Sequence, residues 1–76
     1  MRVKVSAHDI LEKNLGKTVF VRLKSRRGLR GRLEGFDEHL NLVLKATEYL
    51  NGSSQVKKLG SIILRGDNIV IVSPSK

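Results

Sequence analysis

The chain has 76 residues, of which 15 are lysine or arginine and 7 are aspartate or glutamate, so its formal net charge is +8. It contains no cysteine, which excludes disulfides, thiolate zinc sites and cysteine nucleophiles. A chain this short has a thin core, so oligomerisation is the expected source of further stability, and the positive charge favours a polyanionic partner such as nucleic acid over a role in solubility alone.

The first predicted element is a short helix from about residue 7 to residue 15. Ser6 can cap the N–H groups of the first turn, and Asp9 lies three residues later, near the positive end of the helix. Gly16 suits the left-handed residue that follows a helix. The apolar residues recur at helical spacing at Ile10, Leu11 and Leu15.

Five strands are predicted after the helix, the first from about residue 17 to residue 24. Its inward face carries Val19, Val21 and Leu23. A turn at residues 25–28 leads to a second strand from Leu29 to Asp37, which contains Gly31 and Gly35. Interior glycines mark a sharp bend or a close backbone approach, so we expect a strongly curved sheet.

The third strand is predicted from His39 to Thr47, with His39 and Asn41 on one outward face. A turn at residues 51–54 precedes the last two strands, which run roughly over residues 55–64 and 68–72.

These last two strands are apolar on both faces at Ile62–Leu64 and Ile69–Val72, which indicates burial on both sides. Either a second subunit pairs edge to edge with them and can close a ring, or a five-stranded barrel closes on itself; the pattern leaves both open. Every apolar run is too short for a membrane span. Met1–Val5 leads into a polar segment rather than a signal peptide, so we expect a cytoplasmic protein.

Basic residues are concentrated between positions 22 and 32, with no acid among them. On an alternating hairpin, the side chains that could share one solvent face and contact phosphates are Arg22, Lys24, Arg30 and Arg32. The alternative is a solvated outer face without a ligand.

The segment Asp37–Asn41 is the second candidate site. Asp37 and His39 lack a third metal ligand at suitable spacing, and no cleft or nucleophile supports acid–base work by His39, so we predict no metal, no cofactor and no enzyme activity. The imidazole of His39 and the amide of Asn41 suit stacking and hydrogen bonding to a single-stranded base. Arg65–Asn68, the third candidate, is by itself typical of a tight turn.

Two segments together resemble the motifs of the Sm/LSm family. Residues 31–44, GRLEGFDEHLNLVL, are similar to the first Sm motif, and residues 63–70, ILRGDNIV, are similar to the second. The resemblance runs from about Ile10 to Val72 and implies one Sm domain over residues 1–76, with the first motif region at about 18–48 and the second at about 58–72. The implied fold is mainly β: an N-terminal helix and a five-stranded, strongly bent antiparallel SH3-like barrel.

The resemblance also implies assembly. Family members form rings in which the fourth strand pairs with a neighbour's fifth. The short turn at residues 51–54 is most similar to archaeal Sm-like proteins, which implies a homoheptamer.

The RNA-binding residues that the family implies are His39, Asn41, Arg65, Gly66 and Asp67. A base would lie between the imidazole of His39 and the guanidinium of Arg65. Asn41 would contact the edge of uracil, with its amide held by Asp67, and Gly66 would let the backbone approach the nucleotide.

Two further positions follow from the resemblance. Asp37 is expected to order its loop rather than to contact RNA. The family usually has glycine near position 26, where this chain has Arg26 followed by Arg27, so the roles of these two arginines stay open.

We therefore predict a non-enzymatic, ring-forming protein that binds single-stranded uridine-rich RNA at the inner rim of the ring and acts in RNA processing or ribonucleoprotein assembly, with other ribonucleoprotein components as further partners. The alternative is a small SH3-like structural component of a larger ribonucleoprotein, bound as a monomer through its basic hairpin.

Overall fold

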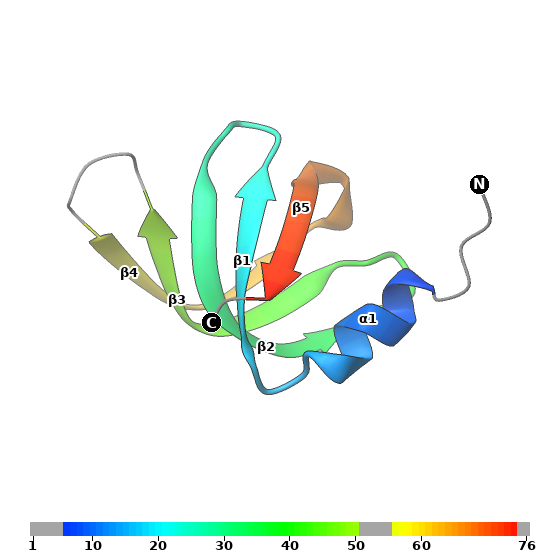
Figure 1. Cartoon of the computed structure of the whole chain (residues 1–76). Coiled ribbons are helices and arrows are strands. Elements are labelled where there is room, and N and C mark those ends of the chain that lie inside the picture. The colour runs from blue at the N-terminus through cyan, green and yellow to red at the C-terminus, as the bar shows by residue number, and fades with distance from the viewer. Residues whose placement is uncertain (1–5, 51–55, 75–76) are drawn as a thin grey trace.

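The structure is a computed structural model, and it describes residues 6–50 and 56–74. One helix precedes five strands, as predicted (Figure 1). The elements are α1 (Ala7–Lys13), β1 (Thr18–Leu23), β2 (Gly28–Phe36), β3 (Leu42–Leu50), β4 (Val56–Leu64), the 3₁₀ turn η1 (Gly66–Asn68) and β5 (Ile69–Pro74). In the described ranges, no helix has the length and apolar character needed to span a bilayer.

Helix α1 begins with the predicted capping box. The backbone N–H of Asp9 donates to the Ser6 hydroxyl (3.1 Å), and the N–H of Ser6 donates to the Asp9 carboxylate (3.2 Å). The helix ends at Lys13, two residues before the predicted end, because the Asn14 side chain donates to the carbonyl of Ile10 (2.8 Å) and caps the last turn. Gly16 then adopts the expected left-handed backbone (φ +80°).

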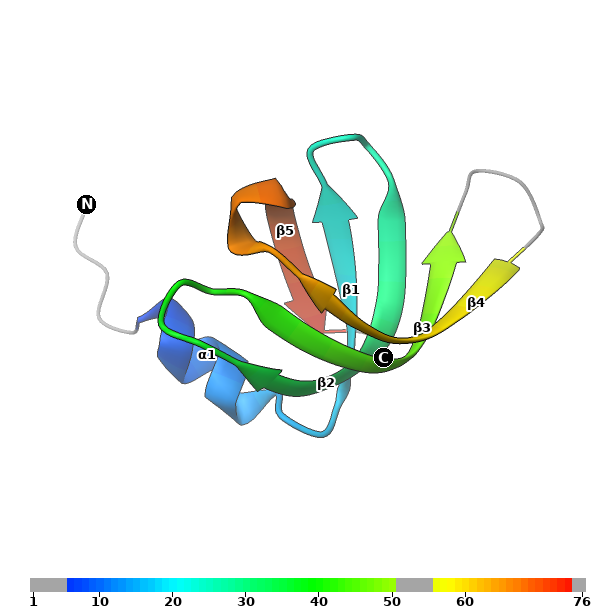
Figure 2. The same cartoon turned by 180° about the vertical axis from the view of Figure 1, so that it is seen from behind.

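The strands form one antiparallel sheet in the order β4-β3-β2-β1-β5. The sheet bends strongly, and α1 lies at one end of it, away from the β1–β2 hairpin (Figures 1 and 2). Gly31 has the predicted close approach, because a Cβ there would lie 2.9 Å from the Thr47 hydroxyl oxygen. Gly35 has open space around it and lies instead at an irregularity in the β2–β3 register.

The core is formed by side chains of α1 and of the strands β1, β2 and β3. The alternation predicted for the first strand is confirmed, since Val19 and Val21 are fully buried. The buried apolar side chains are Leu11, Val19, Val21, Leu29, Leu33, Leu42 and Leu44.

Strands β4 and β5 are the two edges of the sheet, and within the described residues each pairs with one strand only. The barrel therefore does not close on itself through these strands. Their apolar side chains stay exposed: 73% of Ile63, 56% of Val70 and 51% of Ile71. Long, apolar, unpaired edges favour pairing with another chain.

The strand boundaries differ from the predicted ones mainly at β3, which begins at Leu42 rather than at His39 and continues to Leu50. The last strand starts at Ile69 because Asn68 belongs to the 3₁₀ turn, and it extends to Pro74. The turn predicted at residues 51–54 lies outside the described residues.

Candidate nucleic-acid interface

The loop between β2 and β3 is a tight turn organised by Asp37. One carboxylate oxygen of Asp37 accepts the backbone N–H groups of His39 (2.9 Å) and Asn41 (3.0 Å). The N–H of Leu40 donates to the Asp37 carbonyl (3.0 Å), and Leu40 has a positive φ of 62°. Extended pairing is impossible in this conformation, so the prediction that His39 and Asn41 share the face of a strand is wrong. The expectation that Asp37 orders the loop agrees with these contacts.

The side-chain amide of Asn41 is held at both ends. Its nitrogen donates to the second carboxylate oxygen of Asp37 (2.8 Å), and its oxygen accepts the backbone N–H of Gly66 (2.8 Å). The predicted partner, Asp67, lies elsewhere: its carboxylate is 3.7 Å from the guanidinium of Arg65. The amide keeps one N–H and one oxygen lone pair for a ligand.

Gly66 lies directly against the loop rather than against open solvent. A Cβ at this position would be 2.5 Å from the carbonyl oxygen of His39 and 2.9 Å from that of Leu40. The close approach inferred for this glycine therefore exists, but the group it approaches is the protein backbone and not a nucleotide. This contact and the Asn41 hydrogen bond join the two motifs into one site.

His39 and Arg65 lie on the two segments that Asn41 and Gly66 join. Each side chain is 77% exposed, and each has one exposed carboxylate nearby: Glu38 lies 3.6 Å from His39, and Asp67 lies 3.7 Å from Arg65. Both planar groups are thus available to solvent beside the fixed amide of Asn41.

The pKa of Asp37 lies below its ordinary value, chiefly because its carboxylate accepts the side-chain and backbone hydrogen bonds of Asn41. The carboxylate is therefore ionised at neutral pH and remains an acceptor. Within residues 6–50 and 56–74, no three acidic or histidine side chains gather in a way that could hold a metal ion.

The basic residues of the β1–β2 hairpin separate into two groups. The strand register places Arg22, Arg30 and Arg32 on one face, as predicted, whereas Lys24, the fourth residue predicted for this face, lies in the turn that follows β1. Arg30 donates to Glu48 (2.7 Å) and Arg32 to Glu34 (2.8 Å), so carboxylates offset both charges. Arg22 and Lys24 are exposed, and neither has a carboxylate within 4.0 Å in the described part of the chain.

Two backbone hydrogen bonds of the site were not predicted from the sequence: the one from His39 to Asp37 and the one from Gly66 to Asn41. Aspartate two residues before a turn residue commonly accepts its N–H, and this signal could have placed Asp37 as the partner of the His39 backbone. The donation from the N–H of Gly66 to Asn41 carried no sequence signal, because 25 residues separate the two groups.

The sequence matches the family model described as the LSM domain over residues 9–74. An snRNP Sm-like protein of Methanococcoides burtonii is 50% identical over 66 residues, which cover 87% of this chain and 92% of the relative. An snRNP Sm-like protein of Pyrococcus furiosus is 46% identical over 68 residues, which cover 90% of both chains.

Solved structures match as well. A heptameric archaeal Sm protein has a TM-score of 0.84 at 35% identity, over 90% of this chain and 98% of that one. The Sm protein of Pyrococcus abyssii, in complex with a uridine heptamer, has a TM-score of 0.86 at 41% identity, over 93% of this chain and all of that one.

Proposed function

Because the chain belongs to the Sm/LSm family, whose members are non-enzymatic RNA-binding ring proteins, we propose that it forms a homoheptameric ring that binds single-stranded uridine-rich RNA, one nucleotide per subunit, at the inner rim. The RNA is held for processing or for ribonucleoprotein assembly. The observation that carries this proposal is the doubly held amide of Asn41.

The fixed amide explains a preference for uracil. Uracil offers an N3–H donor next to a carbonyl acceptor, which match the free lone pair and the free N–H of Asn41. Cytosine offers an acceptor at N3 and an amino donor, so both contacts are mismatched. A flip of the amide would place its NH2 group against the N–H of Gly66 and its oxygen against the carboxylate of Asp37. The orientation that suits uracil is therefore the only one with both internal hydrogen bonds.

Stacking supplies affinity that does not depend on the base. The imidazole of His39 and the guanidinium of Arg65 are exposed, planar and placed on the two joined segments. Each such contact contributes about 1–3 kcal/mol per base. Asp67, 3.7 Å from the guanidinium of Arg65, orients that side chain rather than Asn41.

The edges of the sheet support the ring. The edge strand β4 of one subunit can pair with the edge strand β5 of the next, and such a heterologous contact closes into a ring when the rotation between subunits permits it. The exposed side chains of β4 and β5, Ile63 above all, would be buried by this contact. A hollow of about 310 Å³ between α1 and β5 adjoins the same edge and offers apolar room for a neighbouring subunit. The heptameric Sm structures to which the chain is similar favour seven subunits.

Equilibrium binding of seven-uridine and seven-cytidine RNAs tests the base assignment. The parent should prefer the uridine RNA, and Asn41→Ala should weaken its binding and reduce the preference. Thr18→Ala, which removes an exposed hydroxyl at the start of β1, is the control and should leave both affinities unchanged. Unaltered uridine binding by Asn41→Ala would refute the assignment.

Light scattering tests the assembly. A heptamer of 8.5 kDa chains has a mass of about 60 kDa. A monomer that does not bind uridine RNA would instead support the SH3-like structural component bound through its hairpin.

A further inference from the structure

The charges of the β1–β2 hairpin are not distributed evenly. On the strands, Glu34 accepts Arg32 at 2.8 Å and has Lys45 at 3.8 Å, while Glu48 accepts Arg30. At the end of the hairpin no acid offsets the cations: within the described ranges, no carboxylate lies within 4.0 Å of Lys24, Arg26 or Arg27. All three side chains are exposed.

A groove connects this hairpin end with the base site. It has a volume of about 220 Å³, and it is lined by Leu23, Lys24 and Ser25 on one side and by Ile63, Leu64, Arg65 and Asn68 on the other. The backbone N–H of Lys24 donates to the carbonyl of Asn68 (2.9 Å), so the hairpin is tied to the turn that carries Arg65. One end of the groove is therefore Arg65, which we place against the base, and Lys24 lies on its opposite wall.

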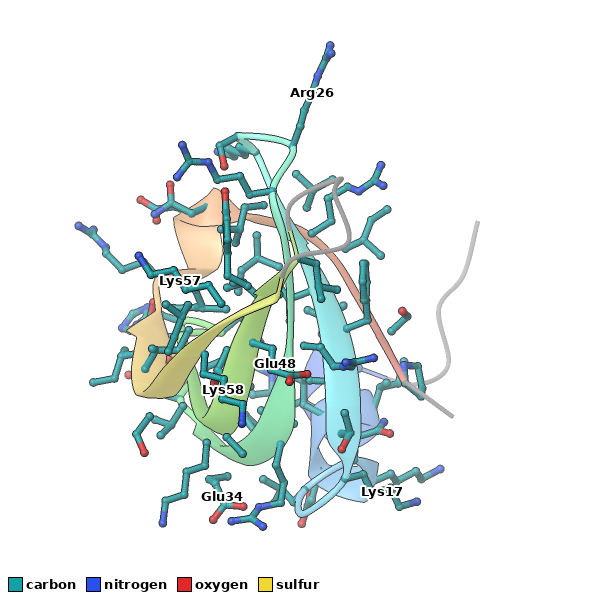
Figure 3. All side chains as sticks on the ribbon, turned by 90° about the vertical axis from the view of Figure 1, so that its left-hand side faces the viewer. Lys17, Arg26, Glu34, Glu48, Lys57 and Lys58 are labelled. Atoms are coloured by element: carbon teal, nitrogen blue, oxygen red, sulfur yellow. The ribbon has the colours of Figure 1, made fainter. Side chains whose placement is uncertain are left out.

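Arg26 stands beyond the groove in a backbone conformation that favours glycine. Its φ is +68°, so the turn is not shifted and Arg26 itself occupies the left-handed position. Its side chain points away from the fold at the tip of the hairpin (Figure 3). Arg27 is held differently, since its guanidinium carbon lies 5.7 Å from the centre of the Tyr49 ring. Strained non-glycine residues are concentrated at functional sites, which points to a use for the charge of Arg26.

We propose that the groove and the hairpin tip form a second RNA contact, here called the hairpin track, which binds the phosphate backbone of nucleotides that adjoin the base held at Arg65. The proposal rests on the function proposed above. The ligand is a phosphate backbone because exposed cations without a carboxylate within 4.0 Å in the described ranges, Lys24 in the groove and Arg26 at the hairpin tip, lie on the hairpin that faces Arg65 across the groove. Such contacts add affinity without adding base preference.

Two RNAs and three variants test the track. The first RNA is seven uridines alone. The second, the extended RNA, is seven uridines with ten cytidines or ten adenosines added at one end, and it is made in a version for each end. Arg26→Gly removes the guanidinium and suits the left-handed backbone, Arg26→Lys keeps the charge, and Lys17→Gln removes an exposed cation at the opposite end of the molecule from Arg26 (Figure 3).

The parent should bind the extended RNA more tightly than seven uridines. Arg26→Gly should keep its affinity for seven uridines and lose affinity for the extended RNA. Its slope of log affinity against log salt should be shallower by about 0.7 for each phosphate contact removed. A fourfold rise in salt should therefore reduce the affinity of Arg26→Gly by about 2.6-fold less, per lost contact, than it reduces the affinity of the parent. Arg26→Lys should restore the slope, and Lys17→Gln should behave as the parent.

Three results would overturn the track: equal parent affinities for the two RNAs, an unchanged affinity of Arg26→Gly for the extended RNA, or an equal loss in Lys17→Gln, which would indicate net charge rather than the hairpin. Failure of the parent to bind seven uridines would count against the proposed function instead. The effect of Arg26→Gly on the extended RNA would then still decide the track.

Discussion

The substitution Gly66→Ala should damage the base site through a collision that the structure defines. The new Cβ would lie 2.5 Å from the His39 carbonyl oxygen and 2.9 Å from that of Leu40. Both are backbone atoms, so no rotamer change relieves the contact, and the loop must move by about 0.5 Å to restore 3.0 Å. Overpacking of this kind costs about 1–3 kcal/mol. The same movement lengthens the 2.8 Å hydrogen bond from Gly66 to Asn41, which fixes the amide.

Loss of one well-placed hydrogen bond to the base corresponds to about 1 kcal/mol, and loss of the stacking geometry adds at least as much, so uridine affinity should fall by about thirtyfold or more per site. Titration of labelled seven-uridine RNA measures the affinity, and urea unfolding measures the stability. Gly35→Ala is the matched control, because nothing lies within 4 Å of its added Cβ, and it should bind as the parent does. Wild-type affinity in Gly66→Ala would refute the argument that this contact positions Asn41.

Three other predictions follow from single features. Since its pKa is lowered, ionised Asp37 stabilises the loop fully above its ordinary value of 3.8, and this stabilisation is lost as the pH falls through the lower folded value; NMR titration of the Asn41 amide should show this, and Asp37→Asn should abolish it. Arg26→Gly should stabilise the fold by about 0.5–1 kcal/mol in urea unfolding, because relief of the left-handed strain exceeds the entropy cost of glycine, whereas Ser25→Gly, without a positive φ, should destabilise it. Ile63→Asp, at a side chain 73% exposed on the edge strand, should reduce the mass in light scattering to that of a single chain of 8.5 kDa; an intact ring would contradict the proposed edge contact.

The sequence predicts most of the fold because its signals are local. The capping box at Ser6 and Asp9 and the alternation of Val19 with Val21 depend on residues a few positions apart, and both are confirmed. The doubly apolar last strand is explained by its position at an edge, where Val70 and Ile71 are exposed on the isolated chain.

The errors concern side chains that compete with the backbone. Alternation alone extends the third strand back to His39, but the carboxylate of Asp37 captures two N–H groups that the strand would need. The prediction that Asp67 holds the amide of Asn41 is also wrong, because Asp37 accepts that hydrogen bond. Two carboxylates were chemically suitable, and only the geometry of the loop shows that Asp37 is the nearer one.

The site exists because one stretch of sheet register brings its two halves together. Leu42 pairs with Leu64 at the ends of β3 and β4, which places Asn41 beside the residues that follow β4. A slip of one residue in this pairing would turn the side chains of β4 to the other face and move the N–H of Gly66 away from Asn41. Because β4 is an edge strand, only β3 holds its register within the described residues. A neighbouring subunit paired along β4 would therefore stabilise the register on which the proposed uracil selection depends, so ring assembly and base selectivity should be lost together.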